Sequence, residues 1–247
     1  MATPRPLPEL VRFCHPAKIL AGARLPGTLT DEDLARLYGT DTRTYRALAG
    51  EISAEACRAA AGLPRLPGRI LALGDSLTDD LGSWAEILRA AGATVANGGL
   101  SGDTTTGARV RLARLLEARP EHAIVLLGTN DARRHGRDGA PMLVSHDESR
   151  RNLRALDAAL RRVCARVTWI TPPPVADPAL AEPDLIWHAR DVAANADLVR
   201  ELDPRAVDLW PGWTADHLSA DGLHPSPAGQ RLIAERVCTA PSPGAAS

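Results

Sequence analysis

A serine, a histidine and a carboxylate occur in this sequence in contexts where they could form a nucleophilic site. Ser76 lies in the sequence Gly-Asp-Ser-Leu-Thr at residues 74–78, directly after the apolar run 70–73. Near the other end of the chain, Asp221 and His224 are three residues apart on a predicted turn. A carboxylate at that spacing can accept a hydrogen bond from the imidazole, whose other nitrogen can then take a proton from a serine. The alternative is structural, because Ser and Asp are also common turn and helix-capping residues.

Two further loops offer hydrogen-bond donors to an anionic oxygen. Residues 97–104 read Asn-Gly-Gly-Leu-Ser-Gly-Asp-Thr, and their glycines allow backbone N–H groups to come close to a ligand. Residues 128–131 read Gly-Thr-Asn-Asp, in which the side-chain amide of Asn130 can donate. Each loop also fits a simpler role as a turn with a helix cap. Arg133 and Arg134 follow, and either meet an anionic substrate group or are solvated.

Strands and helices that would position these loops alternate from Arg69 onward. Near-continuous apolar strands joined by helices predict a parallel sheet covered by helices on both faces. The loops that follow the strands should then meet at one edge of the sheet, where ligands bind in such folds. Strands are predicted at 70–73, 94–96, 123–127, 167–170 and 206–209, and helices at 82–92, 103–118, 145–165, 188–202 and 226–238.

The first 66 residues carry no chemical motif and predict three short helices. Thr30, with an acidic residue three positions later, begins the first helix as a capping box. The second and third helices are predicted at 41–49 and 53–61, each followed by a glycine. Residues 11–14 are predicted to be a short strand or a docking segment.

Prolines at 64 and 67 predict a boundary after these helices. We therefore expect an N-terminal, mainly helical extension at 1–66, one domain at 67–240, and a disordered tail at 241–247.

Composition excludes several classes of partner. The 29 basic and 30 acidic residues leave a net charge of −1, which gives no electrostatic case for binding nucleic acid. No apolar run is long enough to span a membrane. The first ten residues contain three prolines and no apolar core of a secretory signal, so we expect a cytoplasmic protein.

The four cysteines are far apart in the sequence, which predicts free thiols rather than disulfides or a zinc site.

The four motifs together resemble those of the SGNH hydrolases, also called the GDSL esterase/lipase family. The resemblance covers about residues 69–238 and includes residues 74–77, 97–104, 128–131 and 221–225. It implies a flavodoxin-like three-layer α/β/α sandwich. The five strands predicted above would form its parallel sheet, and the small N-terminal helical extension lies outside the resemblance. Thr78 replaces the last glycine of the G-x-S-x-G elbow, which argues against an α/β-hydrolase.

The resemblance also assigns roles to individual residues. It implies that Ser76 is the nucleophile, His224 the general base, and Asp221 the residue that orients it. It further implies an oxyanion hole made by Ser76, Gly102 and Asn130. The three acidic neighbours of these motifs are predicted to brace the loops through hydrogen bonds to the backbone; they are Asp75, Asp103 and Asp131.

The expected function is that of a serine esterase, which hydrolyses a carboxylic ester or thioester through an acyl-enzyme and needs no metal or organic cofactor. One alternative is an acyltransferase that uses the same acyl-enzyme. Another is a hydrolase that docks through residues 1–66 to a carrier protein, a larger assembly or a second copy of itself. A catalytically silent scaffold is disfavoured because Ser76, Asp221 and His224 are all present. The substrate is expected to be a small ester, and the sequence does not distinguish acetylated sugars, lysophospholipids, acyl-CoA thioesters and aryl esters.

Overall fold

A parallel sheet of four strands forms the centre of the molecule. The computed structural model describes residues 7–13, 30–136, 139–182 and 184–241. The strand order is β2-β1-β3-β5, and all neighbouring pairs are parallel. The strands are β1 (Arg69–Gly74), β2 (Thr94–Gly99), β3 (His122–Leu126) and β5 (Arg166–Ile170).

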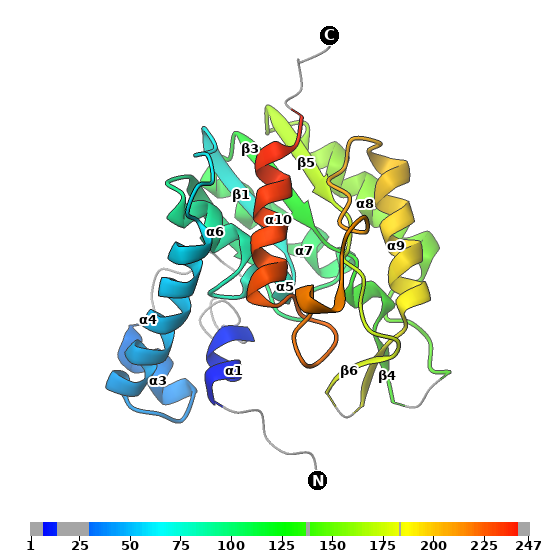
Figure 1. The fold of residues 1–247 in the computed structure, drawn as a ribbon. Coiled ribbons are helices and arrows are strands. Elements are labelled where there is room, and N and C mark those ends of the chain that lie inside the picture. The colour runs from blue at the N-terminus through cyan, green and yellow to red at the C-terminus, as the bar shows by residue number, and fades with distance from the viewer. Residues whose placement is uncertain (1–6, 14–29, 137–138, 183, 242–247) are drawn as a thin grey trace.

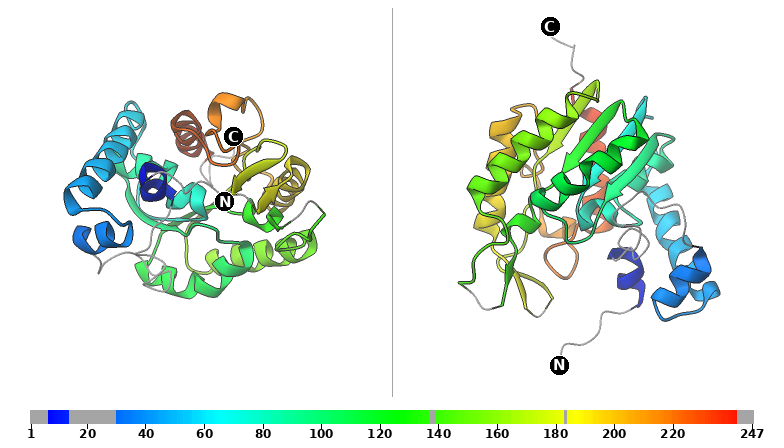
Figure 2. Two further views of the ribbon diagram at one scale, coloured as in Figure 1. Left: turned by 90° about the horizontal axis from the view of Figure 1, so that it is seen from below. Right: turned by 180° about the vertical axis from the view of Figure 1, so that it is seen from behind.

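Helices cover both faces of this sheet, as predicted. In β1, Ile70 and Ala72 face one layer while Leu71 and Leu73 face the other, because side chains alternate along a strand. In Figure 1, α10 lies in front of the sheet with α7 and α8 behind it, and Figure 2 shows these two from behind. The front layer contains α6 (Trp84–Ala90) and α10 (Pro227–Thr239), and the rear layer contains α7 (Thr105–Leu115), α8 (His146–Leu160) and α9 (Ala189–Leu202).

The predicted fifth strand at 206–209 is wrong. Val207 makes a single parallel bridge to the end of β5 and the pairing then stops. Three consecutive prolines at 172–174 follow β5, and they have no N–H with which to continue a ladder. The hydroxyl of Thr171 accepts the N–H of Leu209 at 2.9 Å instead, so this segment leaves the sheet.

A small antiparallel sheet, which the sequence did not predict, lies beyond the carboxyl ends of the central strands (Figure 1). Its strands are β4 (Arg134–His135), β6 (Ala179–Glu182) and β7 (Leu185–Trp187), in the order β4-β7-β6. Trp187 and Leu223 belong to one buried apolar cluster, so this sheet supports the segment that ends at His224. Among the described residues, this part of the chain also contains one α-helical turn, α5 (Ser76–Asp79), and three 3-10 turns: η1 (Leu116–Ala118), η2 (Asn130–Ala132) and η3 (Ala215–His217).

The N-terminal region contains α1 (Leu7–Phe13), α3 (Asp31–Leu37) and α4 (Thr42–Ala59). The capping box at Thr30 is confirmed, because its hydroxyl accepts the Asp33 N–H while the Asp33 carboxylate accepts the Thr30 N–H. The prediction of a strand at 11–14 is wrong where the structure describes it, since residues 11–13 are helical. Cys14 and the tail residues 242–247 lie outside the described residues.

The two helices predicted at 41–49 and 53–61 form one continuous helix, α4. Gly50 is a predicted helix stop, but its φ is not positive and the helix continues through it. A single glycine costs a helix about 1 kcal/mol, which good helix formers on both sides can offset. Ala56 and Ala60 pack in the same core cluster as Ile70 of β1, so α4 shares its core with the sheet. No helix in the described ranges has the length and apolar character of a membrane span.

Replacing Gly50 with alanine should stabilise the protein. A Cβ at this exposed helical position would meet no atom within 4 Å, and alanine reduces the conformational entropy of the unfolded chain. We expect the free energy of unfolding in urea to rise by about 0.5–1 kcal/mol.

Gly62→Ala is the matched control for this prediction. A Cβ on Gly62 would also meet no atom within 4 Å, but its φ is +80°, a conformation that is strained for alanine. Destabilisation by Gly50→Ala, or equal effects of the two substitutions, would contradict the continuous helix.

Candidate active site

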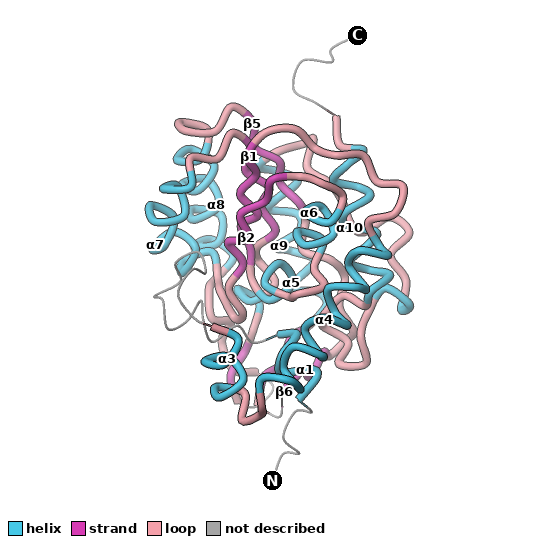
Figure 3. Tube along the Cα trace, turned by 90° about the vertical axis from the view of Figure 1, so that its left-hand side faces the viewer, coloured by secondary structure: helices cyan, strands magenta, loops and turns pink. Residues whose placement is uncertain are grey.

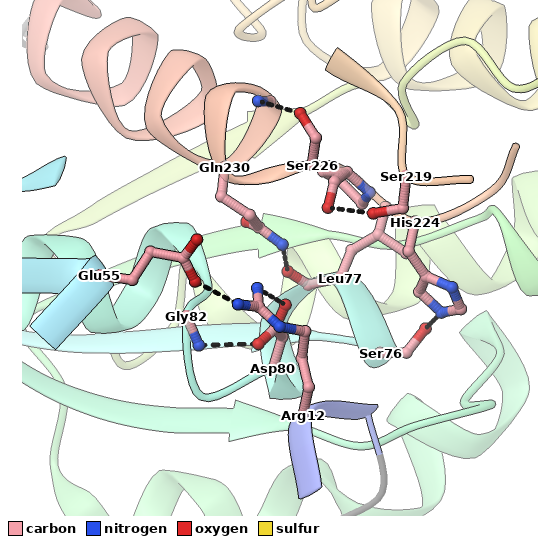
Figure 4. A network of polar contacts seen from close by, with 12 residues as sticks. Arg12, Glu55, Ser76, Leu77, Asp80, Gly82, Ser219, His224, Ser226 and Gln230 are labelled. Atoms are coloured by element: carbon pink, nitrogen blue, oxygen red, sulfur yellow. Dashed lines mark hydrogen bonds and ion pairs between the residues drawn. The ribbon is translucent and has the colours of Figure 1, made fainter. Parts of the chain in front are cut away.

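Ser76, His224 and Asp221 form a continuous hydrogen-bonded chain at the carboxyl edge of the sheet. His224 Nε2 lies 3.0 Å from Ser76 Oγ, although the two residues are 148 positions apart in sequence (Figure 4). The other ring nitrogen, Nδ1, lies 2.6 Å from Asp221 Oδ2. The imidazole is thus placed to accept the serine proton on one nitrogen while the carboxylate accepts the proton of the other.

The turn that carries Ser76 is built by its neighbours in sequence. Ser76 begins α5, and the carboxylate of Asp75 caps this single turn by accepting the N–H of Leu77 at 3.0 Å. Gly74 permits the turn to fold back, because a Cβ at that position would lie 2.0 Å from Thr78 Oγ1. The strand therefore ends in a tight turn with the serine at its start.

Two buried amide side chains hold this turn against the rest of the fold. Gln230 of α10 donates to the carbonyl of Leu77 at 3.1 Å and accepts the N–H of Trp84 at 2.8 Å. Asn97 donates to the carbonyl of Thr78 at 2.8 Å. Gln230 is not among the predicted site residues, although a glutamine on the apolar face of the last predicted helix is a signal of a buried polar contact.

The turn that carries His224 is held by Asp221 itself. One carboxylate oxygen accepts the backbone N–H groups of Leu223 and His224, at 2.9 and 3.0 Å, while the other contacts the imidazole. Burial opposes ionisation of Asp221, but the hydrogen bond and charge of His224 and the two backbone N–H groups lower its pKa to about 2. The partner of the imidazole is therefore a carboxylate at neutral pH.

Gly102 and Asn130, the predicted oxyanion residues, lie on adjacent loops. The Asn130 amide donates to the carbonyl of Asp103 at 3.1 Å, next to Gly102, and it has a second N–H for another acceptor. The loop of Gly102 is tied to α5, because Ser101 donates from its N–H and its hydroxyl to Asp79 at 3.2 and 2.8 Å. Gly102 has a φ of +80°, which favours glycine.

A buried ion pair, which the sequence did not reveal, fixes the ends of β1 and β2. Arg111 of α7 donates to the carboxylate of Asp103 at 2.7 Å and to the carbonyls of Gly98 and Gly74 at 2.5 and 3.0 Å. Its side chain is only 6% exposed, so these contacts replace the water that the guanidinium loses. The pKa of Asp103 is raised, because the effect of burial exceeds the opposing effect of the Arg111 charge.

The predicted bracing role of the three acidic neighbours is confirmed. Asp75, Asp103 and Asp131 each accept a backbone N–H, from Leu77, Thr104 and Thr105 respectively. Asp131 also accepts the hydroxyls of Thr105 and Ser149, both at 2.6 Å, which joins its loop to α7 and α8. Burial raises the pKa of Asp131, and these hydrogen bonds oppose the rise.

The two arginines after Asn130 have different surroundings. Arg134 is partly buried and forms an ion pair with Asp191 at 2.7 Å. Arg133 Nη1 lies 3.4 Å from the place that a Cβ on Gly102 would occupy, so its guanidinium is beside the predicted oxyanion loop. Within the described part of the chain, no cluster of three or more His, Cys, Asp or Glu side chains is arranged to hold a metal ion.

Asp75 has the most unusual electrostatic environment near the site. It is completely buried, and among the described residues its Oδ2 has no hydrogen-bond partner. Burial raises its pKa to about 7; the hydrogen bond from Leu77 opposes this, while the charges of Asp103 and Asp131 add to it. A raised pKa means that the folded protein binds this proton more tightly than the unfolded chain does.

Asp75→Asn should therefore change how stability depends on pH. The stabilising contribution of the protonated carboxyl is complete below the ordinary pKa of 3.8 and is lost as the pH rises through about 7. Asparagine keeps an oxygen for the Leu77 N–H and does not ionise, so the variant should gain stability relative to wild type between pH 4 and 7. Urea unfolding across this range measures the difference, and a constant difference would show that Asp75 ionises normally.

The chain matches the model of the GDSL-like Lipase/Acylhydrolase family over residues 72–232, which confirms the resemblance to SGNH hydrolases. A lipase/acylhydrolase structure from Enterococcus faecalis is 25% identical, with a TM-score of 0.56 over 69% of this chain and 93% of that one. The acetylxylan esterase Axe2 from Geobacillus stearothermophilus is 19% identical, with a TM-score of 0.54 over 71% and 94% of the two chains. The acetyl xylan esterase AlAXEase is 17% identical, with a TM-score of 0.55 over 70% and 98%. A comparison with curated protein sequences gave no match. The chain belongs to the GDSL-like lipase/acylhydrolase family and is an ester-hydrolysing enzyme.

Proposed function

We propose that this enzyme hydrolyses a carboxylic ester or thioester through an acyl-enzyme formed on Ser76. The observation that carries the proposal is the hydrogen-bonded chain from Ser76 through His224 to Asp221, with distances of 3.0 and 2.6 Å. The serine and the histidine are 6% and 4% exposed, so little water competes for their contact.

The first half of the reaction forms the acyl-enzyme. Ser76 Oγ attacks the carbonyl carbon while His224 Nε2 takes its proton. Collapse of the tetrahedral intermediate breaks the bond to the leaving group, which receives the proton from His224. Water then attacks the acyl-enzyme with the same histidine as base, and this releases the acid and restores the serine.

Asp221 has an electrostatic role in both halves. With a pKa of about 2 it is negatively charged at neutral pH, and it stabilises the imidazolium that forms when His224 takes the proton. Its two backbone hydrogen bonds hold the carboxylate still, so the imidazole keeps one tautomer and one orientation.

The oxyanion would be held by the N–H groups of Ser76 and Gly102 and by the amide of Asn130. Support comes from the hydrogen bond between Asn130 and the Asp103 carbonyl, which fixes the amide on the loop of Gly102. Donors that are fixed before reaction stabilise developing charge without reorganisation.

Two of the similar structures are acetylxylan esterases, so acetylated sugars belong in the first substrate panel. The panel should also contain p-nitrophenyl esters of increasing acyl length and an acyl thioester. Product analysis in the presence of an added alcohol separates hydrolysis from acyl transfer.

Ser76→Ala and His224→Ala should each abolish turnover of every ester that the wild type hydrolyses. Loss of either member of such a triad lowers kcat by about 10⁴–10⁶. Ser53→Ala, which changes an exposed serine of α4, is the control and should retain full activity. Turnover by the Ser76→Ala variant close to that of wild type would refute the acyl-enzyme.

Asn130→Ala should lower kcat and leave KM nearly unchanged, because the amide would bind the oxyanion rather than the ground-state ester. Removal of one such donor costs about 2.7–4 kcal/mol, or about 10²–10³ in kcat. Steady-state kinetics on the best ester of the panel measure this. A rise in KM with normal kcat would instead assign Asn130 to substrate binding.

A further inference from the structure

A charged contact connects the N-terminal helices to the turn that carries Ser76. Arg12 of α1 forms ion pairs with Glu55 of α4 and with Asp80, whose Oδ2 is 3.4 Å from Arg12 Nη1 (Figure 4). The Asp80 side chain is fully buried, and that of Arg12 is 18% exposed. Figure 3 shows α1 and α4 side by side. The guanidinium thus bridges two helices and a loop.

Asp80 in turn fixes the end of the turn that Ser76 begins. It follows α5 directly, and its N–H donates to the carbonyl of Ser76 at 3.2 Å. Its Oδ1 accepts the N–H of Gly82 at 2.7 Å, and its carbonyl accepts the N–H of Ser83 at 3.0 Å. One residue therefore defines how the chain leaves the nucleophile turn.

Close packing accompanies these polar contacts. A Cβ on Gly82 would lie 3.0 Å from Arg12 Nη1 and 3.3 Å from Ile52 Cγ2. Leu81 packs on an apolar cluster that contains Val11 and Ile52. Apolar side chains therefore pack beside both ends of the contact, the buried Val11 next to Arg12 and the partly buried Leu81 next to Asp80.

Electrostatics favours a permanently charged Arg12. Burial lowers the pKa of the guanidinium, but the carboxylates of Asp80 and Glu55 outweigh this and raise it. A partly buried guanidinium that contacts two carboxylates is screened by water less than an exposed pair is. The matched family region covers residues 72–232, so it includes Asp80 but neither Arg12 nor Glu55.

We propose that Arg12 is a positioning residue for the nucleophile: through Asp80 it holds the Ser76 turn at hydrogen-bonding distance from His224. This inference depends on the proposed role of Ser76. It also gives the N-terminal helices a function within the catalytic unit, as a brace for the nucleophile turn.

Arg12→Ala should lower kcat on a p-nitrophenyl ester by about tenfold to a hundredfold, with KM within twofold of wild type, because small misplacements of a reacting group cost this much. The rate constant for covalent labelling of Ser76 by a phosphonylating ester should fall in parallel. Arg12→Lys should restore part of both rates, since a lysine keeps the charge but does not span two carboxylates as the planar guanidinium does.

Arg46→Ala is the matched control. Arg46 is on α4, and its side chain is 66% exposed and pairs with Asp31 at 2.7 Å. Its loss removes an ion pair between α3 and α4 of the N-terminal region without touching the nucleophile turn, so kcat and the labelling rate should not change.

A double-mutant cycle tests the route through Asp80. In an Asp80→Asn background, Arg12→Ala should add little further loss of kcat. If Arg12→Ala does not fold, kcat is measured for Arg12→Lys and Glu55→Gln instead. Both should have a lower kcat than wild type, and wild-type kcat in both would overturn the proposal.

Two outcomes separate this inference from the proposed function. Turnover by Ser76→Ala would refute the proposed function itself. An inactive Ser76→Ala together with an Arg12→Ala variant that has only a lower melting temperature, and normal kcat and labelling rate, would refute the positioning role alone.

Discussion

The 3.0 Å contact between Ser76 Oγ and His224 Nε2 constrains two segments that are 148 positions apart in sequence. It joins a turn after the first central strand to a turn before the last helix, and neither can shift without breaking it. Gln230 couples the two, because it lies on the helix that follows His224 and bonds to the Leu77 carbonyl within α5 and to the N–H of Trp84 at the start of α6. A buried amide that satisfies one donor and one acceptor has one favourable position, which makes the separation of the two turns well defined.

The carboxyl edge of the sheet also concentrates buried charge. Asp75, Asp103 and Asp131 lie there with a single buried arginine, Arg111, in direct contact with one of them. Burying charges costs free energy that mutual attraction repays only when the hydrogen bonding is nearly complete. Burial raises the pKa of all three carboxyl groups. Asp103 and Asp131 have hydrogen-bond partners for both oxygens, whereas among the described residues Asp75 has a partner for one oxygen alone, and its pKa rises to about 7. Burying these carboxyl groups lowers the stability of the fold, and the loops that carry them are fixed before substrate binds.

The sequence predicts those features that depend on residues close together in the chain. Glycines and polar residues indicate turns around Ser76, Gly102, Asn130 and His224. In a parallel sheet, the turns that follow the strands converge at the carboxyl edge. The failures come from long-range partners. The strand at 206–209 has suitable residues, but the prolines after β5 leave it without donors to pair with. Gly50 is a plausible helix stop, but packing of α4 on the sheet overrides it. Nothing near Arg111 or Arg12 in sequence indicates which carboxylate each one meets.

The N-terminal helices cannot be treated as an appendage when their role is tested. Deleting residues 1–66 would separate a docking module from a hydrolase only if the two shared no core. Ala56, Ala60 and Leu66 pack in the same cluster as Trp84 and Ile233, so the deletion would open the front layer of the domain and expose apolar surface. Loss of activity after such a deletion would then have the same appearance whether the helices bind a partner or support the site. Substitutions confined to the Arg12 contacts leave that core in place, which is why they can distinguish the two roles.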